Sequence, residues 1–263
     1  MKNIAVITGA SSGMGREFVR MLDAENFDEI WGIALGKDAL EKVKSETKTP
    51  MQVFEMDLTD DKSFEFYKNL LEKEKPNVSW LVNCSGFGKF GRHDEWSVET
   101  SANMVDLNCK ALLKMTEMTL PYMQKGGRIV EIASVAGFQP IPYIAVYGAT
   151  KAFVVSYSRA INQELKPRGI SVTCVCPFWT KTAFFDRAKD TNAKTEVVSK
   201  YVAMYDPQKV IAQAIRDAKK RKELSIHGFK AKSQVRLVKL LPHKIVMKIW
   251  MKQQDLYKKY QNK

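Results

Sequence analysis

Short runs rich in β-branched residues alternate with longer segments of helical periodicity along most of this chain. Such alternation is typical of strand–helix–strand units, in which parallel strands form a sheet covered by helices on both faces. Strands are predicted at residues 4–8, 29–34, 52–55, 80–82, 128–133, 171–176 and 224–226. Helices are predicted at residues 13–25, 37–46, 60–73, 96–123, 147–166 and 207–222. The sequence therefore predicts an α/β fold with one doubly wound parallel sheet of about seven strands.

No linker rich in Ser, Gly or Pro and no internal repeat divides these units, so one domain is expected over residues 1–229. Within it, residues 178–205 are expected to cover the site, and residues 230–263 to form a C-terminal extension. The cysteines include no Cys-x-x-Cys pair and the histidines lie far from them, which predicts free thiols and no metal. No apolar run is long enough for a signal peptide or a membrane span, so a cytoplasmic protein is expected.

A glycine-rich turn, Thr-Gly-Ala-Ser-Ser-Gly-Met-Gly-Arg, joins the first predicted strand to the first predicted helix. Glycines let the backbone approach a pyrophosphate, whose charge then faces the N–H groups of the helix N-terminus. Glycines in such a loop can also serve only to turn the chain. The candidate cofactor residues here are Gly9, Ser11, Ser12, Gly13, Met14 and Gly15.

Tyr147 and Lys151 stand four residues apart at the start of a predicted helix, and Ser134 follows the fifth predicted strand. Residues at this spacing share one helix face, so the ammonium is expected to lower the pKa of the phenol from about 10. A phenol of lowered pKa can exchange a proton near neutral pH. An isolated Tyr-x-x-x-Lys pattern is more often a surface pair, so the prediction depends on the glycine turn.

These motifs together resemble the short-chain dehydrogenase/reductase superfamily, over residues 3–229. Further matches follow in the family's order, and they are Asp57, Leu58, Asn83, Gly86, Asn108, Pro177, Thr180 and Thr182. The resemblance implies a Rossmann-like catalytic domain that binds NAD(H) or NADP(H) and interconverts a carbonyl compound and an alcohol by hydride transfer. It departs at Cys84, Ser85 and Phe178, where the family usually has Asn, Ala and Gly.

The resemblance also implies roles for individual residues. The glycine turn would hold the pyrophosphate, Asp57 and Leu58 the adenine, and Asn83 and Gly86 the ribose side. Pro177, Thr180 and Thr182 would also contact the cofactor. Ser134 would bind the substrate oxygen, Tyr147 would exchange its proton, Lys151 would hold the nicotinamide ribose and Asn108 would anchor a water.

Cofactor choice depends on the end of the second predicted strand, where a carboxylate binds the adenosine ribose and a basic residue binds a 2′-phosphate. Leu35 stands there and Lys37 follows, so NADP(H) is favoured and NAD(H) stays possible. Arg16 is a second possible source of positive charge. Both basic residues can equally be solvated surface charges.

Aromatic residues gather near the predicted site, which favours an apolar substrate such as a steroid or a long acyl carbonyl compound. The candidate pocket residues are Phe138, Tyr143, Phe178, Trp179, Phe184 and Phe185. Packing of the covering segment explains these residues equally well. A 3-oxoacyl thioester reductase and a non-catalytic dinucleotide sensor are the alternative functions.

The net charge is +13, and residues 225–263 contribute +9 of it from ten basic side chains and Asp255. Residues 244–260 predict a basic amphipathic helix with Val246, Ile249, Trp250, Leu256, Tyr257 and Tyr260 on its apolar side. This helix can contact an anionic membrane, or pack on its own domain or a second subunit. A homodimer or homotetramer is implied by the family, and no nucleic-acid motif is present.

Overall fold

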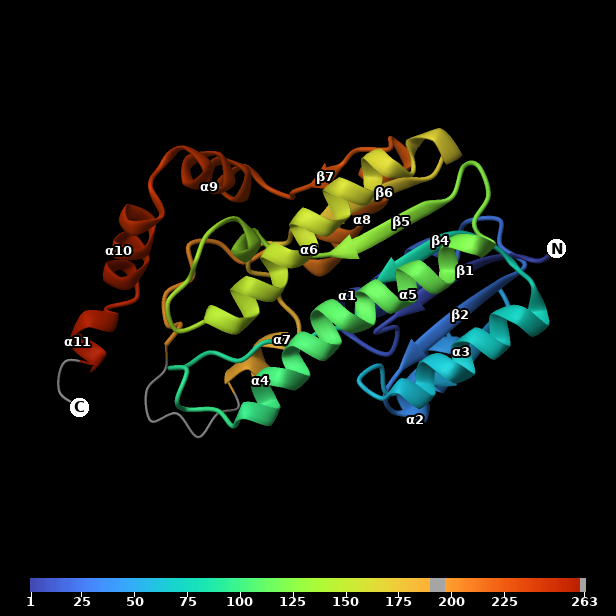
Figure 1. The fold of residues 1–263 in the computed structure, drawn as a ribbon, viewed down its shortest axis with the longest axis horizontal. Coiled ribbons are helices and arrows are strands. Elements are labelled where there is room, and N and C mark those ends of the chain that lie inside the picture. The colour runs from blue at the N-terminus through green and yellow to red at the C-terminus, as the bar shows by residue number, and fades with distance from the viewer. Residues whose placement is uncertain (190–196, 261–263) are drawn as a thin grey trace.

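A parallel sheet in the order β3-β2-β1-β4-β5-β6-β7 forms the centre of the computed structural model, which describes residues 1–189 and 197–260 (Figure 1). Its strands are β1 Asn3–Thr8, β2 Glu29–Ala34, β3 Met51–Glu55, β4 Asn77–Asn83, β5 Arg128–Ile132, β6 Ser171–Val175 and β7 Leu224–Ser225. The seven predicted strands and the doubly wound α/β fold are therefore confirmed.

The α-helices occupy most of the segments between the strands. They are α1 Gly13–Leu22, α2 Lys37–Lys44, α3 Asp61–Glu74, α4 Val98–Val105, α5 Leu112–Thr119, α6 Ala145–Glu164, α7 Phe184–Lys189, α8 Pro207–Lys219, α9 Phe229–Leu240, α10 His243–Gln253 and α11 Leu256–Tyr260. Between α4 and α5 the chain forms a π-helical turn, η1, over Asp106–Ala111. The described residues also form 3-10 turns at η2 Leu120–Tyr122, η3 Val135–Phe138 and η4 Lys166–Arg168.

The core lies on both faces of the sheet, as the apolar strands predict. Along β1, Ala5 and Ile7 pack in the cluster that holds α1 and α8, while Ile4 and Val6 pack in the cluster that holds α3 and α5. This alternation follows from the strand period of two residues. Because parallel strands place their carboxyl ends at one edge, the loops after β1, β4, β5 and β6 meet there.

The C-terminal extension folds as three helices, α9 to α11, at the end of the molecule away from the N-terminus (Figure 1). The helix predicted over 244–260 is interrupted: α10 ends at Gln253, and Asp255 adopts a left-handed backbone with φ of 56° before α11 begins. Gln254 is buried and bonds the backbone of Ser199 and Lys200. The indole N–H of Trp250 donates to the carbonyl of Pro142 at 3.0 Å. The extension therefore packs on the loops around the site.

Parts of two predictions lie outside the described residues. These are residues 190–196 of the covering segment 178–205 and residues 261–263 of the extension. No helix of the described ranges is long and apolar enough to cross a membrane.

Candidate active site

The glycine turn holds the end of β1 directly against the start of α1. Gly9 and Gly13 have φ angles of 66° and 53°, which other residues adopt rarely. A Cβ atom on Gly15 would lie 2.0 Å from the carbonyl oxygen of Gly9. Ser12 is the N-cap of α1, and its side chain makes no capping hydrogen bond. The first N–H groups of α1 therefore stay available for an anion such as a pyrophosphate.

The turn lies where the strand order reverses, between β1 and β4. The hydroxyl oxygen of Thr8 accepts hydrogen bonds from the backbone N–H groups of Cys84 and Ser85, both at 3.0 Å. A Cβ on Gly9 would lie 3.1 Å from the backbone of the same two residues. In sheets of this type ligands bind at the crevice formed there. The residues present thus fit a dinucleotide.

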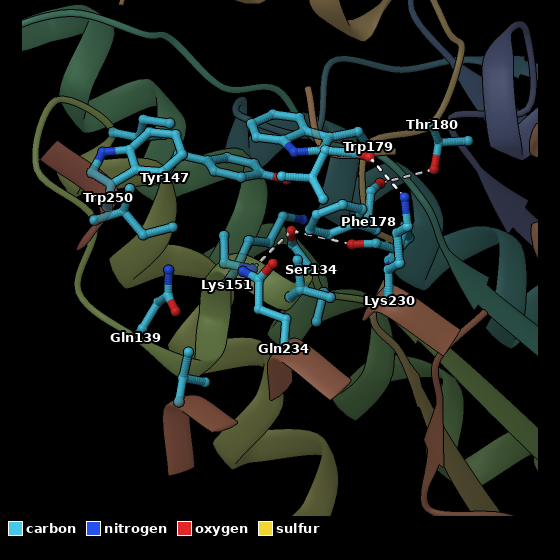
Figure 2. A pocket seen from close by; sticks show the side chains of 18 of the residues that line it. Ser134, Gln139, Tyr147, Lys151, Phe178, Trp179, Thr180, Lys230, Gln234 and Trp250 are labelled. Carbon is cyan, nitrogen blue, oxygen red and sulfur yellow. Dashed lines mark hydrogen bonds between the residues drawn. The ribbon is translucent and has the colours of Figure 1, made fainter. Parts of the chain in front are cut away.

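The four predicted catalytic residues come from three elements and converge at the carboxyl edge of the sheet. Ser134 follows β5, Tyr147 and Lys151 lie on the first turns of α6, and Asn108 lies in η1. Ser134, Lys151 and Asn108 are buried. The Lys151 ammonium donates to the carbonyl of Ile132 at 2.8 Å and lies 5.7 Å from the centre of the Tyr147 ring. Figure 2 shows Ser134 and Lys151 side by side with Tyr147 beyond them.

The pKa of Tyr147 differs from the sequence-based expectation. Burial raises the pKa of the phenol to about 12, and a hydrogen bond with Ser134 opposes this rise. The sequence predicted a lowering of this pKa by Lys151, whereas burial has the larger effect and raises it. Burial also lowers the pKa of the Lys151 ammonium. The Tyr147 phenol beside Lys151 is therefore protonated near neutral pH. The protonated phenol is the form that can donate a proton to a carbonyl oxygen.

Asn108 ties the loop after β4 to α6. Its amide nitrogen donates to the carbonyl of Phe87 at 2.8 Å and to the hydroxyl of Thr150 at 3.1 Å, and its oxygen accepts from the Phe87 N–H at 3.0 Å. A Cβ on Gly86 would lie 2.8 Å from the Asn108 oxygen and 3.6 Å from the Lys151 nitrogen. The π-helical turn brings Asn108 into this position, and such turns are frequent at functional sites.

A cavity of about 550 Å³ opens beside Ser134, Tyr147 and Lys151. Four of the six candidate pocket residues line it: Phe178, Trp179, Phe184 and Phe185. Phe138 and Tyr143 are not among the residues that line this cavity. Phe138 packs against other core residues and beneath the Lys239 ammonium. Tyr143 has a φ of 66°, and Ile141 and Ile144, on either side of it in the sequence, line the cavity.

Several cavity residues were not predicted from the sequence. Phe90, in the loop after β4, contacts the rings of Trp179, Phe184 and Phe185 at 6.3–6.4 Å between centres. The extension supplies a complete wall, with Trp250 on the side opposite Thr180 in Figure 2. Its lining residues are Phe229, Lys230, Ser233, Gln234, Leu237, Val238, Leu241, Val246, Ile249, Trp250 and Gln253. The amphipathic pattern of the extension indicated that its apolar side packs on another surface. No sequence pattern identified that surface as the wall of the cavity.

Among the predicted cofactor residues, Pro177 and Thr180 line the cavity, and a Cβ on Gly13 would lie 3.7 Å from Thr182. Thr182 therefore faces the glycine turn across the cleft. Asp57 uses its carboxylate to accept from the N–H and hydroxyl of Thr59 at 2.8 and 2.7 Å, and Leu58 is buried.

Asn83 has a different surrounding from the one expected. Its amide donates to the Thr116 hydroxyl at 2.9 Å and to the buried carboxyl of Glu131 at 3.2 Å. The side chain therefore points into the core between β4, β5 and α5, and not toward a ribose. The fifth strand places Glu131 there, and burial raises its pKa to about 8.

The end of β2 carries both charge signs. Leu35 is 64% exposed, and the N–H groups of Gly36 and Lys37 both donate to the Glu55 carboxylate at 3.2 Å. The guanidinium of Arg16 pairs with Glu46 at 2.6 Å. A carboxylate from β3 therefore stands where the sequence around Leu35 predicted none.

Comparison with known proteins agrees with this geometry. The family model described as short chain dehydrogenase matches residues 3–193. The chain belongs to this family. It is 30% identical over 178 residues to an uncharacterized oxidoreductase of Staphylococcus epidermidis, covering 67% of this chain and 77% of that protein. It is also 30% identical over 198 residues to the very-long-chain 3-oxoacyl-CoA reductase of Rattus norvegicus, covering 71% of this chain and 62% of that protein.

Solved structures of the family have the same architecture. A short-chain dehydrogenase from Sphingobium yanoikuyae in complex with NADPH superposes with a TM-score of 0.75 at 25% identity, over 89% of this chain and 92% of that one. The bulky-bulky ketone specific alcohol dehydrogenase from Comamonas testosteroni superposes with a TM-score of 0.71 at 25% identity, over 91% of this chain and 92% of that one. The chain is therefore an NAD(P)-dependent oxidoreductase acting on alcohol and carbonyl groups.

Proposed function

We propose that this short-chain dehydrogenase interconverts a bulky apolar ketone and its alcohol, with NADP(H) as its cofactor. The observation that carries the proposal is the cavity of about 550 Å³, whose wall holds Ser134, Tyr147 and Lys151 and is otherwise mostly aromatic and aliphatic. A cavity of this size accommodates a molecule as large as a steroid or a long acyl chain. The similar Comamonas testosteroni enzyme is described as specific for bulky ketones.

The catalytic residues act on the substrate oxygen. Ser134 donates a hydrogen bond that orients the carbonyl, and the protonated phenol of Tyr147 delivers its proton to the same oxygen. Lys151 supplies positive charge beside the phenolate left behind, and Asn108 holds the loop and helix between which these groups stand. The glycine turn and Lys151 would hold the cofactor, which supplies or accepts the hydride. The apolar walls exclude water from the reacting oxygen.

The side chain of Gln139 is a polar group in a mostly apolar part of the cavity. The amide oxygen of Gln139 is buried without a hydrogen-bond partner among the described residues, and Gln139 lines the cavity. Figure 2 places it apart from Ser134 and Tyr147. A buried polar atom without a partner is costly, so a substrate with a second polar group offsets this cost. We therefore expect a hydroxyl or amide on the substrate at a distance from its ketone.

The preference for NADP(H) rests on Leu35, which leaves the end of β2 without its own carboxylate, and on Lys37 beside it. Glu55 and the Arg16–Glu46 pair oppose it, so a moderate preference is expected rather than an exclusive one. The complex of the similar Sphingobium yanoikuyae protein contains NADPH.

Long-chain 3-oxoacyl thioesters are the second candidate substrates. The rat relative is described as a 3-oxoacyl-CoA reductase, and Lys230 lines the cavity from α9, where a phosphate of a thioester carrier could be bound.

The experiment follows oxidation of NADPH, and separately NADH, with steroid ketones, 3-oxoacyl thioesters and small aldehydes. We expect the highest kcat/KM with one bulky class and with NADPH, and its loss in Tyr147→Phe. Equal kcat/KM for small and bulky ketones contradicts the apolar-substrate proposal. NADPH binding without turnover of any class favours the sensor function instead.

We further propose a homo-oligomer that uses the face formed by α4 and α6. Val105 and Phe153 are exposed there, and Phe153 stacks on Tyr157 with 5.8 Å between the ring centres. Light scattering of the purified protein tests this proposal, since a monomeric mass at micromolar concentration excludes it.

A further inference from the structure

Exposed apolar side chains gather around the opening of the cavity. Val202, Phe229, Leu237 and Ile249 line the cavity and are also exposed, so with Lys230 they form its rim. Phe229, at the start of α9, is 81% exposed. Side chains of this kind are normally buried, and an exposed apolar group around a ligand cavity indicates an interaction site. The exposed apolar side chains of the rim therefore indicate that another molecule contacts the opening of the cavity.

The apolar surface continues from the rim along the extension. Leu240 is 82% exposed at the end of α9, and Ile245 and Tyr257 are exposed on α10 and α11. Neither Leu240 nor Ile245 lines the cavity. These side chains extend the apolar surface beyond what a substrate in the cavity would cover.

Basic residues stand between these apolar side chains. Seven of them are exposed, and none forms an ion pair with a described carboxylate: Lys230, Lys232, Arg236, Lys239, Lys244, Lys248 and Lys252. The surrounding segment carries +9. Helices with exposed apolar residues and flanking lysines bind at anionic lipid surfaces, where the apolar groups enter the acyl boundary and the ammonium groups meet the headgroups.

We propose that α9 and α10 dock the cavity rim on an anionic phospholipid surface, so that the substrate passes between the bilayer and the cavity without crossing water. The second half of this inference rests on the proposed apolar substrate; the docking itself does not. A ketone that partitions into lipid is scarce in water, so an opening that faces the bilayer raises its concentration at the site.

Charge favours lipid over the other partners that the surface could bind. Two copies of the chain would bring two segments of +9 together, which is repulsive. An acidic protein would complement the lysines, but it would leave Phe229 and Leu240, the two most exposed apolar side chains of this surface, without a specific pocket. A fluid lipid phase covers isolated apolar side chains of any arrangement.

Co-sedimentation with lipid vesicles tests the docking directly. The full chain is expected to sediment with vesicles of phosphatidylcholine mixed with phosphatidylglycerol, to stay in solution with phosphatidylcholine alone, and to be released by salt. Equal recovery in the supernatant with both vesicle types overturns the proposal.

Two double variants separate the contributions, and neither touches the cavity. Lys244→Gln with Lys248→Gln is expected to weaken binding about fivefold per lysine, equivalent to about 1 kcal/mol each. Leu240→Ser with Ile245→Ser is expected to weaken it at least about tenfold. The matched controls, Lys42→Gln with Lys62→Gln and Val98→Ser, change exposed residues on other elements and should bind as the parent does. Parent-like binding by both double variants overturns the proposal.

Activity then distinguishes this inference from the proposed function. With a water-soluble bulky ketone, the Leu240→Ser, Ile245→Ser variant should turn over at the parental rate. With a ketone held in anionic vesicles it should be slower than the parent. Equal rates in vesicles overturn the delivery step. Vesicle binding without turnover of any ketone contradicts the proposed function and leaves the docking standing. Self-association abolished by the same variant identifies a subunit interface and overturns the lipid partner.

Discussion

The two halves of the cleft are built in different ways. The cofactor half consists of closely packed backbone in the turn after β1. Gly15 leaves no room for a Cβ, and a Cβ on Gly9 would lie only 3.1 Å from the backbone of Cys84 and Ser85. The substrate half consists of side chains from loops and helices far apart in the sequence, from Phe90 to Trp250. The cofactor half is formed by neighbouring residues of one turn, and its backbone tolerates few substitutions. The shape of the substrate half depends on which side chains line the cavity.

This difference explains why one family serves many substrates. A pyrophosphate is the same in every member, so the turn that holds it is constrained by backbone sterics. The substrate wall contributed by α9 and α10 comes from this chain's own extension and sets the volume of its cavity. The following predictions test this division, from the largest expected effect to the smallest.

Gly15→Ala should disrupt the cofactor half most strongly. The added Cβ would lie 2.0 Å from the Gly9 carbonyl oxygen, which is backbone and cannot move aside. We expect a loss of roughly 4 kcal/mol in the free energy of unfolding and no NADPH binding. Gly148→Ala is the matched control, because its nearest neighbour would be 3.8 Å away. Chemical denaturation measures both, and equal stability of the two variants would falsify the steric argument.

Tyr147→Phe should abolish turnover while both halves stay intact. The variant lacks the proton donor, and we expect kcat to fall about a thousandfold. NADPH affinity, measured by calorimetry, should be unchanged. A variant that retains more than about a tenth of the parental kcat shows that another group delivers the proton.

Trp250→Ala should affect the substrate half alone. The change removes the hydrogen bond to Pro142 and a wall of the cavity, with a cost of about 3 kcal/mol to the packing of the extension. We expect kcat/KM to fall about tenfold for bulky ketones and little for small aldehydes. Tyr257→Ala, on the exposed side of α11, is the control. An equal loss for both substrate classes means that the wall does not select for size.

Glu131→Gln should change how stability depends on pH. Burial raises the pKa of Glu131 to about 8, so between its ordinary pKa and 8 the unfolded chain is ionised while the folded chain keeps the proton. Parental stability therefore falls as pH rises through this range. From pH 5 to pH 8 the variant should lose roughly 3 kcal/mol less than the parent. Denaturation at both pH values measures this, with Glu41→Gln on exposed α2 as control. Parallel curves for parent and variant refute it.

Glu55→Gln should shift cofactor choice slightly. Its carboxylate accepts from the N–H groups of Gly36 and Lys37, close to where a 2′-phosphate would be bound. Removing the negative charge should improve the ratio of NADPH to NADH affinity about fivefold, or about 1 kcal/mol. Calorimetry with both cofactors measures the ratio. An unchanged ratio places the 2′-phosphate away from this carboxylate.

The fold and the pairing of Tyr147 with Lys151 could be predicted because their signals are local. Strand and helix periods and the glycine turn involve neighbours in the chain, and Tyr147 and Lys151 share one helix face. Asn108 and Ser134 were assigned only through the family resemblance. The surroundings of other residues could not be predicted, because they depend on contacts between residues far apart in the chain. Asn83 donates to Glu131 because β5 brings a carboxyl beside β4.

The sequence by itself determined the parallel sheet and the glycine turn after its first strand, since short-range sterics and hydrogen bonding specify them. Only the tertiary structure decided where the basic extension packs. Its apolar stripe required a partner, but amphipathicity does not identify one. Packing of Trp250 and Val246 into the cavity wall, with Phe229 and Leu240 left exposed around its opening, depends on contacts between residues far apart in the chain, such as Trp250 and Pro142.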